Sequence, residues 1–176
     1  MSRPAYIRPE GSFQVDIPDL GTLDFRLGSG EIVFLSEYGD DRTFVNQPLA
    51  TGPGKIEFKI LGESVLLVRW LGRKLYRFDF RTLTLEDVVE LARSAEDDHA
   101  FMFIRFLDAM ERILVIYENG VICLKQDGSL VWHAAHGKYG NELERVDDLG
   151  VWYSDAEGNS WAYRWEDGGE LGPSNH

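Results

Sequence analysis

The sequence contains one cysteine and no long hydrophobic segment. A lone cysteine, Cys123, excludes an internal disulfide framework and a zinc site built from several cysteines. The longer apolar runs, such as residues 65–68 and 113–117, fall far short of the roughly 20 residues of a membrane-spanning helix. Residues 1–10 lack the apolar core of a secretory signal. These absences predict a cytoplasmic protein that does not interact with membranes.

Recognisable catalytic motifs are also missing. The sequence has no glycine-rich phosphate loop and no nucleophile elbow. Adjacent carboxylates such as Asp40–Asp41 and Asp147–Asp148 occur, but a carboxylate pair performs acid–base chemistry only when burial or a neighbour separates the two pKa values. We therefore predict a protein that is not an enzyme and needs no cofactor, and an unrecognised hydrolase remains a third alternative.

The acidic charge is confined to the second half of the chain. Residues 1–85 contain 11 acidic and 11 basic side chains, whereas residues 86–176 contain 19 acidic and 7 basic ones, so the second half carries the whole net charge of −12. This asymmetry argues against a nucleic-acid-binding protein, which must offset phosphate charge. It is compatible with a surface for a basic protein partner, or with solubility alone.

Alternating apolar and polar residues predict a mainly β fold of antiparallel meanders, either propeller-like or a two-sheet sandwich. Residues 11–80 form the first group of β-hairpins, and residues 101–165 form the second. Between them, residues 84–95 have apolar side chains at helical spacing after a Thr84 that resembles a helix cap, so we expect one α-helix near 85–95. Residues 166–176 are expected to be a frayed tail of a single 176-residue domain.

The segment 113–132 is predicted to be a meander of three strands. Asn119–Gly120 and Asp127–Gly128 are typical two-residue hairpin turns that accept positive φ. With these turns, Ile116 pairs with Cys123, and Cys123 pairs with Trp132. Both faces of the meander are apolar, so we expect it to be buried on both sides, with Ile116, Cys123 and Trp132 packed together.

Part of this segment resembles a known family. The residues Gly120-Val-Ile-Cys-Leu-Lys-Gln-Asp-Gly-Ser-Leu-Val-Trp132 are similar to the blade repeat of quinoprotein-type β-propellers, and residues 64–80 and 149–165 are looser versions of it. The resemblance implies a propeller-like architecture. It transfers no function, because no quinone-site or metal-ligand pattern accompanies it.

Three further features contain residue types that are found in metal sites or reactive groups. His133 and His136 have a spacing that brings two imidazoles together on a helix, but the segment reads as a strand end and loop without a third ligand, so no metal site is predicted. Cys123 lies among apolar neighbours and is expected to behave as a small hydrophobic residue. Residues 155–159 have oxygen ligands around a glycine, but the composition is better explained by a hairpin turn.

Two surfaces are candidates for binding. Acidic residues in turns and loops project outward and form the predicted partner-binding set: Asp97, Asp98, Glu142, Glu144, Asp147 and Asp148. Charge reversal at Asp147 and Asp148 is expected to leave stability almost unchanged. An aromatic row is the alternative, as a platform for a sugar or a protein, or simply as core: Trp152, Trp161, Tyr163 and Trp165.

The first functional hypothesis is a non-enzymatic, acidic protein that binds and inhibits a basic partner. Its most concrete form is an immunity-type inhibitor of a basic toxin or nuclease, which matches the size, the acidity and the absence of motifs. The second hypothesis is a propeller-type module that binds a ligand through the aromatic platform. The sequence leaves the partner's identity and the oligomeric state open.

Overall fold

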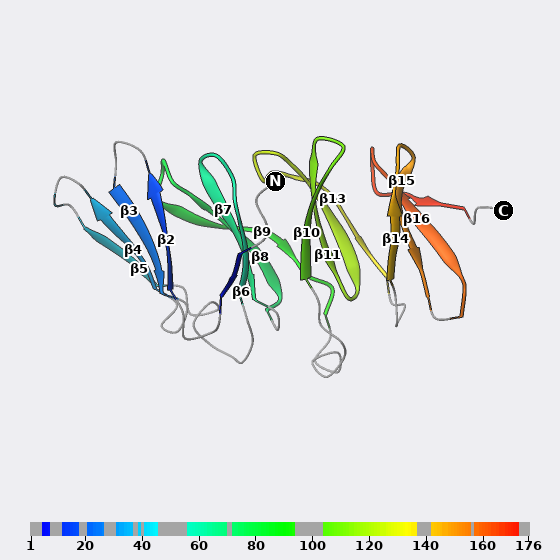
Figure 1. Ribbon diagram of the computed structural model, residues 1–176, viewed down its shortest axis with the longest axis horizontal. Coiled ribbons are helices and arrows are strands. Elements are labelled where there is room, and N and C mark those ends of the chain that lie inside the picture. Colours follow the sequence, from blue (N-terminus) through cyan, green and yellow to red (C-terminus); the bar gives the residue numbers. More distant parts are fainter. Residues whose placement is uncertain are drawn as a thin grey trace. The chain divides into compact units, whose positions relative to one another are not determined.

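The computed structural model describes residues 5–7, 12–17, 21–26, 31–36, 39, 41–45, 56–69, 72–93, 104–136, 142–155 and 157–172. The chain divides into two compact units, Met1–Glu86 (unit 1) and Asp87–His176 (unit 2). The described residues form seventeen strands in four antiparallel sheets (Figure 1). They contain no helix long and apolar enough to cross a bilayer.

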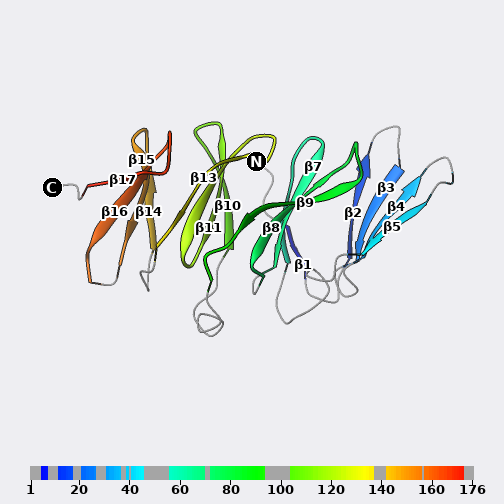
Figure 2. The same cartoon turned by 180° about the vertical axis from the view of Figure 1, so that it is seen from behind.

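Two sheets belong to unit 1 and the residues that directly follow it. The first has the order β2-β3-β4-β5, with β2 (Ser12–Ile17), β3 (Gly21–Arg26), β4 (Glu31–Ser36) and β5 (Arg42–Val45). The second has the order β1-β6-β7-β8-β9, with β1 (Ala5–Ile7), β6 (Ile56–Ile60), β7 (Ser64–Arg69), β8 (Lys74–Asp79) and β9 (Thr84–Glu90). Strand β1 is the one that departs from sequence order, because it joins the edge at β6 (Figure 2).

Two four-stranded sheets form unit 2, and both are up-and-down meanders. The first comprises β10 (Ile104–Ala109), β11 (Arg112–Tyr117), β12 (Gly120–Lys125) and β13 (Leu130–Ala135). The second comprises β14 (Glu142–Val146), β15 (Gly150–Ser154), β16 (Ser160–Arg164) and β17 (Glu170–Leu171). The mainly β, antiparallel prediction is therefore confirmed, and four-stranded meanders agree with the blade resemblance of residues 120–132.

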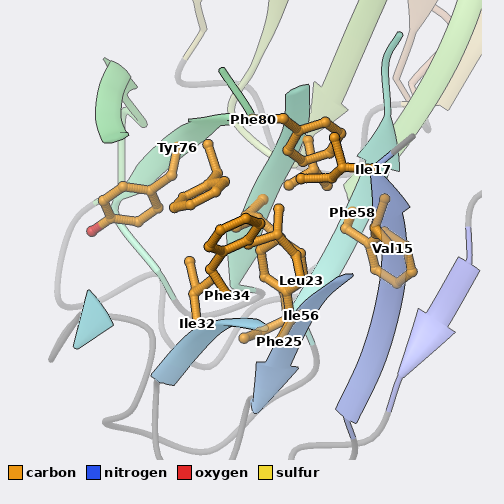
Figure 3. Packing of buried hydrophobic residues seen from close by; sticks show 13 residues of the cluster. Val15, Ile17, Leu23, Phe25, Ile32, Phe34, Ile56, Phe58, Tyr76 and Phe80 are labelled. Atoms are coloured by element: carbon orange, nitrogen blue, oxygen red, sulfur yellow. The ribbon is translucent and has the colours of Figure 1, made fainter. Parts of the chain in front are cut away.

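A core fills the space between the two sheets of unit 1. Leu23 and Phe25 of β3 meet Ile56 of β6 and Phe78 of β8, and all four are fully buried. The rings of Phe25 and Phe78 lie 5.9 Å apart in an edge-to-face arrangement. Figure 3 shows Leu23, Phe25 and Ile56 within this core. Alternation in the strands thus places one apolar face of each sheet against the other.

Unit 2 has its own core between its two sheets. Ile116, Cys123 and Trp132 of the first sheet belong to one cluster with Tyr153 and Trp161 of the second. The predicted packing of Ile116, Cys123 and Trp132 is therefore confirmed. Residues 113–117 and 121–124 are all buried, which also confirms that both faces of the meander are covered.

The turn between β11 and β12 differs from the prediction. Tyr117 pairs with Gly120, so the loop residues are Glu118 and Asn119 rather than Asn119 and Gly120. The pairing shifts by two residues, Ile116 pairs with Val121, and each side chain keeps its expected face. Gly120 is needed in the strand itself, because an added Cβ there would lie 2.6 Å from a backbone oxygen and 2.7 Å from the Tyr117 hydroxyl.

The expected pair of Cys123 with Trp132 is present, and a register shift follows it, so that Leu124 pairs with Leu130. Gly128 in the adjoining turn has a φ of 83°, but the turn is not the predicted two-residue loop, because the Lys125 N–H donates to the Ser129 carbonyl oxygen at 2.9 Å and the Gly128 N–H donates to the Lys125 carbonyl oxygen at 3.0 Å. The N–H of Ser129 donates to Asp127 Oδ1 at 2.8 Å and fixes this turn.

The helix predicted near 85–95 is wrong. Residues 84–90 form β9, the strand next to β8, and residues 94–100 lie outside the described part of the chain. Asp79 Oδ1 accepts the N–H groups of Arg81 and Thr82, and Leu83 adopts a φ of 54°, which turns the chain straight back along β8. The Thr84 hydroxyl contacts the Thr82 hydroxyl at 2.7 Å instead of capping a helix.

Tertiary packing explains this outcome. Leu85 packs against the core of unit 1, and β9 completes the hydrogen bonding of β8 at its free edge. The β-branched Val88 and Val89 suit a strand as well as the apolar spacing suits a helix. Sheet pairing therefore outweighs a helical pattern that was too short to be decisive.

The last part of the chain is more ordered than predicted. The segment expected to fray from Glu166 contains a turn and then β17, where Leu171 pairs with Ala162 of β16. Arg164 donates to both carboxylate oxygens of Asp167 at 3.1 and 2.9 Å, and Gly169 N–H donates to Asp167 Oδ1 at 2.8 Å. Residues 173–176 lie outside the described part.

The β10–β11 turn has unusual backbone geometry. Ala109 pairs with Arg112, so Met110 and Glu111 form a two-residue loop. Both have positive φ, 49° and 56°. A two-residue loop with two positive φ values normally contains Asn or Gly, and each residue held in this region without such a side chain costs of the order of 1 kcal/mol.

Candidate functional site

The sheet β14–β17 is strongly acidic. Residues 142–172 contain nine acidic and two basic side chains, a net charge of −7. Both arginines contact carboxylates of the same sheet: Arg145 contacts Asp147, and Arg164 contacts Asp167. The negative charge of the second half is thus concentrated on this sheet and its turns.

The structure brings four of the six predicted partner-binding residues together. Glu142 and Glu144 are exposed on β14, and Asp147 and Asp148 follow in the β14–β15 turn, where Asp148 is exposed and Asp147 is half-buried. Asp97 and Asp98 lie outside the described residues.

Strand β14 is an edge strand, which increases the exposure of its side chains. The sheet order leaves one side of β14 without a neighbouring strand among the described residues. The register shifts between Leu143 and Arg145, so Glu144 is the extra residue of a bulge. Charges and bulges on an edge strand oppose pairing with another neutral strand. An edge of this kind favours contact through charged side chains.

Asp147 has a structural role that the sequence analysis missed. Its Oδ1 accepts the N–H groups of Leu149 and Gly150 at 2.9 and 3.2 Å, and its Oδ2 accepts the Arg145 Nε–H at 2.9 Å. The Trp152 side chain, the Arg145 guanidinium and these backbone donors lower the pKa of Asp147 to about 2. The expectation that reversing its charge leaves stability unchanged is therefore not supported, whereas the expectation for Asp148 still stands.

Aspartate side chains also accept backbone N–H groups in other turns of unit 2. Asp155 accepts the N–H of Glu157 at 3.0 Å and of Asn159 at 2.8 Å, which confirms that residues 155–159 form a hairpin turn. A hydrogen bond from the Asn159 side chain lowers the pKa of Asp155. The Gly169 N–H lowers the pKa of Asp167 in the same way. Part of the acidity thus stabilises turns, while Glu142, Glu144 and Asp148 face solvent.

Two tryptophans fasten the turns at one end of unit 2. The Trp132 indole N–H donates to the Trp165 carbonyl oxygen at 2.8 Å, and the Trp165 indole N–H donates to the Asp147 carbonyl oxygen at 2.7 Å. Gly168, with a φ of 68°, lies so close that an added Cβ would be 2.7 Å from the Trp132 ring. The start of β13, the β16–β17 turn and the β14–β15 turn are therefore held together.

The predicted aromatic platform is largely core. Trp161 and Tyr163 are 2% and 6% exposed and belong to the cluster between the sheets of unit 2. Trp152 pairs with Ala162 and therefore faces the other side of the sheet, where the Arg145 guanidinium lies 4.2 Å from its ring centre. Trp165 is half-buried. These four residues do not form one exposed row.

A polar cluster at the β11–β12 turn was not found from the sequence. The Ala92 N–H donates to the Tyr117 hydroxyl at 3.1 Å, and this hydroxyl lies 2.6 Å from His133 Nε2. Arg93 forms a two-point ion pair with Glu118, and the two side chains are 1% and 8% exposed. Residues 25 positions apart carry no local signal, because their pairing depends on the tertiary fold.

Burial governs the titration of this region. It raises the pKa of Tyr117 to about 12 and lowers the pKa of His133. His136 is buried against the rings of Tyr153 and Trp161. The Tyr117 hydroxyl and His133 Nε2 share one hydrogen bond, whose donor is set by the tautomer of His133. The arrangement links the chain after β9 to the β11–β12 turn.

Metal binding and thiol chemistry receive no support from this geometry. Within the described ranges, no group of three or more His, Cys, Asp or Glu residues could hold a metal ion. His133 contacts Tyr117, and His136 lies among aromatic rings. Burial raises the pKa of Cys123 to about 11, so the thiol is protonated at neutral pH.

Comparison with known proteins assigns no family to the chain. No protein-family model and no curated protein matches it. Solved structures that align with it include a streptogramin B lyase (10% identity, TM-score 0.44), virginiamycin B lyase from Staphylococcus aureus (9%, 0.46) and the N-terminal domain of Nup159 (13%, 0.39). The alignments cover 92%, 92% and 89% of this chain and 58%, 59% and 44% of those proteins.

These neighbours are propeller-like proteins built from β blades, and the chain spans little more than half the length of the two lyases. Independently of these alignments, the four-stranded antiparallel meanders of the chain are consistent with the blade resemblance of residues 120–132. With TM-scores below 0.5, the alignments assign no residue, activity or partner to this chain.

Proposed function

We propose that this protein is a non-enzymatic binding protein whose acidic β14–β17 sheet contacts a basic protein partner. The observation that carries the proposal is the net charge of −7 in residues 142–172, with Glu142, Glu144 and Asp148 exposed along one edge strand and its turn. Exposed charge of one sign accelerates encounter with an oppositely charged partner.

The most concrete form of this function is an immunity-type inhibitor that covers a basic toxin or nuclease in the cytoplasm. A single-chain β scaffold with rigid turns suits such a role, because binding then requires little ordering of the inhibitor. The tryptophan hydrogen bonds and aspartate-fixed turns of unit 2 provide this rigidity next to the charged edge. A buried Trp161 and Tyr163 favour this function over a ligand-binding aromatic platform.

A pull-down with charge-reversed variants tests the proposal. The immobilised full chain is incubated with host lysate, and the retained basic protein is purified for kinetic measurements. We expect Glu142→Lys with Glu144→Lys to slow its association at least tenfold and to reduce the salt dependence of the rate. Thermal stability should stay nearly unchanged, since both side chains are exposed.

The matched control is Glu86→Lys with Glu90→Lys, which reverses two exposed glutamates on the edge strand β9. It changes the net charge by the same amount and should leave association almost unaffected. The proposal is wrong if no basic protein is retained, or if both double variants slow association equally.

A further inference from the structure

Three exposed apolar side chains distinguish unit 2. Met110, Leu130 and Leu149 are 51%, 43% and 66% exposed, whereas the other large hydrophobic residues in the described part of this unit are buried or half-buried. Single exposed hydrophobic residues are common on protein surfaces, so their positions decide whether they carry meaning.

All three lie at the same end of unit 2. In an up-and-down meander, alternate turns lie at the same end of the sheet, which places the β10–β11 turn with Met110 beside the β12–β13 turn that leads into Leu130. The hydrogen bonds from Trp132 to Trp165 and from Trp165 to Asp147 attach the β14–β15 turn with Leu149 to this end. We call Met110, Leu130, Leu149 and the turns that carry them the turn-end surface.

The backbone holds two of these side chains outward. Met110 and the following Glu111 occupy a two-residue loop with φ values of 49° and 56°, where asparagine or glycine would be less strained. Leu149 lies in a turn that is fixed by Asp147, which accepts the N–H groups of Leu149 and Gly150. Strained positions that persist in a fold often belong to functional segments.

Acidic side chains outnumber basic ones in these turns, which Arg112 and Lys125 border. Exposed carboxylates in the same turns are Glu111, Asp127, Asp148, Glu166 and Asp167. Apolar contacts at the centre and charges at the rim are the usual anatomy of a protein–protein interface. The acidic rim disfavours a second copy of this chain through like-charge repulsion, and it disfavours an anionic membrane for the same reason.

We propose that the turn-end surface is the docking site for the basic partner, and that Met110, Leu130 and Leu149 are its apolar anchors. This inference rests on the proposed function and adds the partner's chemistry: an apolar patch bordered by lysine or arginine. The charges set the rate of encounter, and the apolar anchors set the lifetime of the complex.

Two synthetic peptides test the inference with the full-length chain. One has lysines flanking a Leu-Phe-Leu centre, and the other has the same lysines flanking a Ser-Ser-Ser centre. We expect the apolar peptide to bind at least tenfold more tightly, and Leu149→Ser with Met110→Ser to remove this preference. Ile60→Ser is the control, because Ile60 is 48% exposed in unit 1 and should not affect it.

A second variant excludes loss of folding as the explanation. Met110→Asn keeps the two-residue loop and its acidic Glu111, relieves the positive-φ strain at position 110 and removes the apolar tip. We expect a higher Tm together with weaker binding of the apolar peptide. An unchanged peptide preference in both variants would overturn the inference.

The peptide measurements distinguish failure of the apolar anchors from failure of the acidic surface to bind a basic partner. If Glu142→Lys with Glu144→Lys weakens both peptides while Leu149→Ser changes neither, the acidic surface binds a basic partner without apolar anchors, and the inference is wrong. If neither peptide responds to charge reversal, the proposed function fails as well. Leu149-dependent dimerisation, or Leu149-dependent binding to neutral lipid vesicles, would assign the surface to another occupant.

Discussion

Removal of the Asp147 carboxylate should destabilise the fold, although Asp147 lies on an acidic surface. Three donors depend on it: the N–H groups of Leu149 and Gly150 and the Nε–H of Arg145. We expect Asp147→Ala to lower the free energy of unfolding by about 1–3 kcal/mol, because charge-assisted hydrogen bonds are lost and the turn loses its acceptor. Asp147→Asn should lose less, since its amide oxygen can still accept from the turn.

The lowered pKa of Asp147 gives a second way to calculate how much its carboxylate contributes to the free energy of unfolding. The Trp152 side chain, Arg145 and the backbone donors lower this pKa from 3.8 to about 2. Such a difference corresponds to at most about 2.5 kcal/mol, and solvent screening of a side chain that is 34% exposed reduces it to about 1 kcal/mol. Because the folded pKa is depressed, this contribution is complete above about pH 4 and is lost as the pH falls through about 2.

Urea denaturation of wild type, Asp147→Asn and Asp147→Ala from pH 7 downward measures both effects. The gap between wild type and Asp147→Asn should narrow below about pH 4. Asp148→Ala is the matched control, because Asp148 is exposed in the same turn and should change stability by less than about 0.5 kcal/mol. Equal losses at the two aspartates, or a gap that does not depend on pH, would refute this reasoning.

Two further predictions concern the interior of unit 2. Ile116 is fully buried in its core, so Ile116→Ala should cost about 2–5 kcal/mol in urea denaturation, and a loss below about 1 kcal/mol would contradict the central position of the meander. Burial lowers the folded pKa of His133 below its ordinary 6.5, so stability is complete above that pH and falls as the pH drops below it. The Tm should therefore decrease between pH 7.5 and 5.5, and His133→Gln should flatten this decrease; equal slopes would exclude His133 as the cause.

Local sequence patterns were sufficient for most strands. Residues 113–132 and the hairpin of β15 and β16 combine alternation with turn residues, and their strands formed where expected, although the pairing of β11 with β12 is shifted by two residues. The exposure of Glu142, Glu144 and Asp148 was also predicted, on the ground that turns and loops project charged side chains outward, although Glu142 and Glu144 lie on the edge strand β14. These features depend on neighbours within a few residues in the chain.

Turn geometry was less predictable than strand positions. The Asn119–Gly120 pair predicted a turn at these two residues, yet Gly120 lies in β12 and pairs with Tyr117. Glycine fits this strand position because the Tyr117 side chain occupies the space that a Cβ would need. The strained positive-φ turn formed at Met110–Glu111, where neither residue type favours positive φ. Pairing of β10 with β11 fixes that loop at two residues, and the strain is the consequence.

The sequence by itself determined the class of fold, its central meander and the half of the chain that carries the charge. Tertiary structure decided that residues 84–90 are a strand, because β8 offers an edge and the core of unit 1 accepts Leu85. It also brought Arg93 to Glu118 and turned Asp147 from a free surface charge into a turn acceptor. Such contacts join residues through the packed fold, and short-range periodicity carries no information about them.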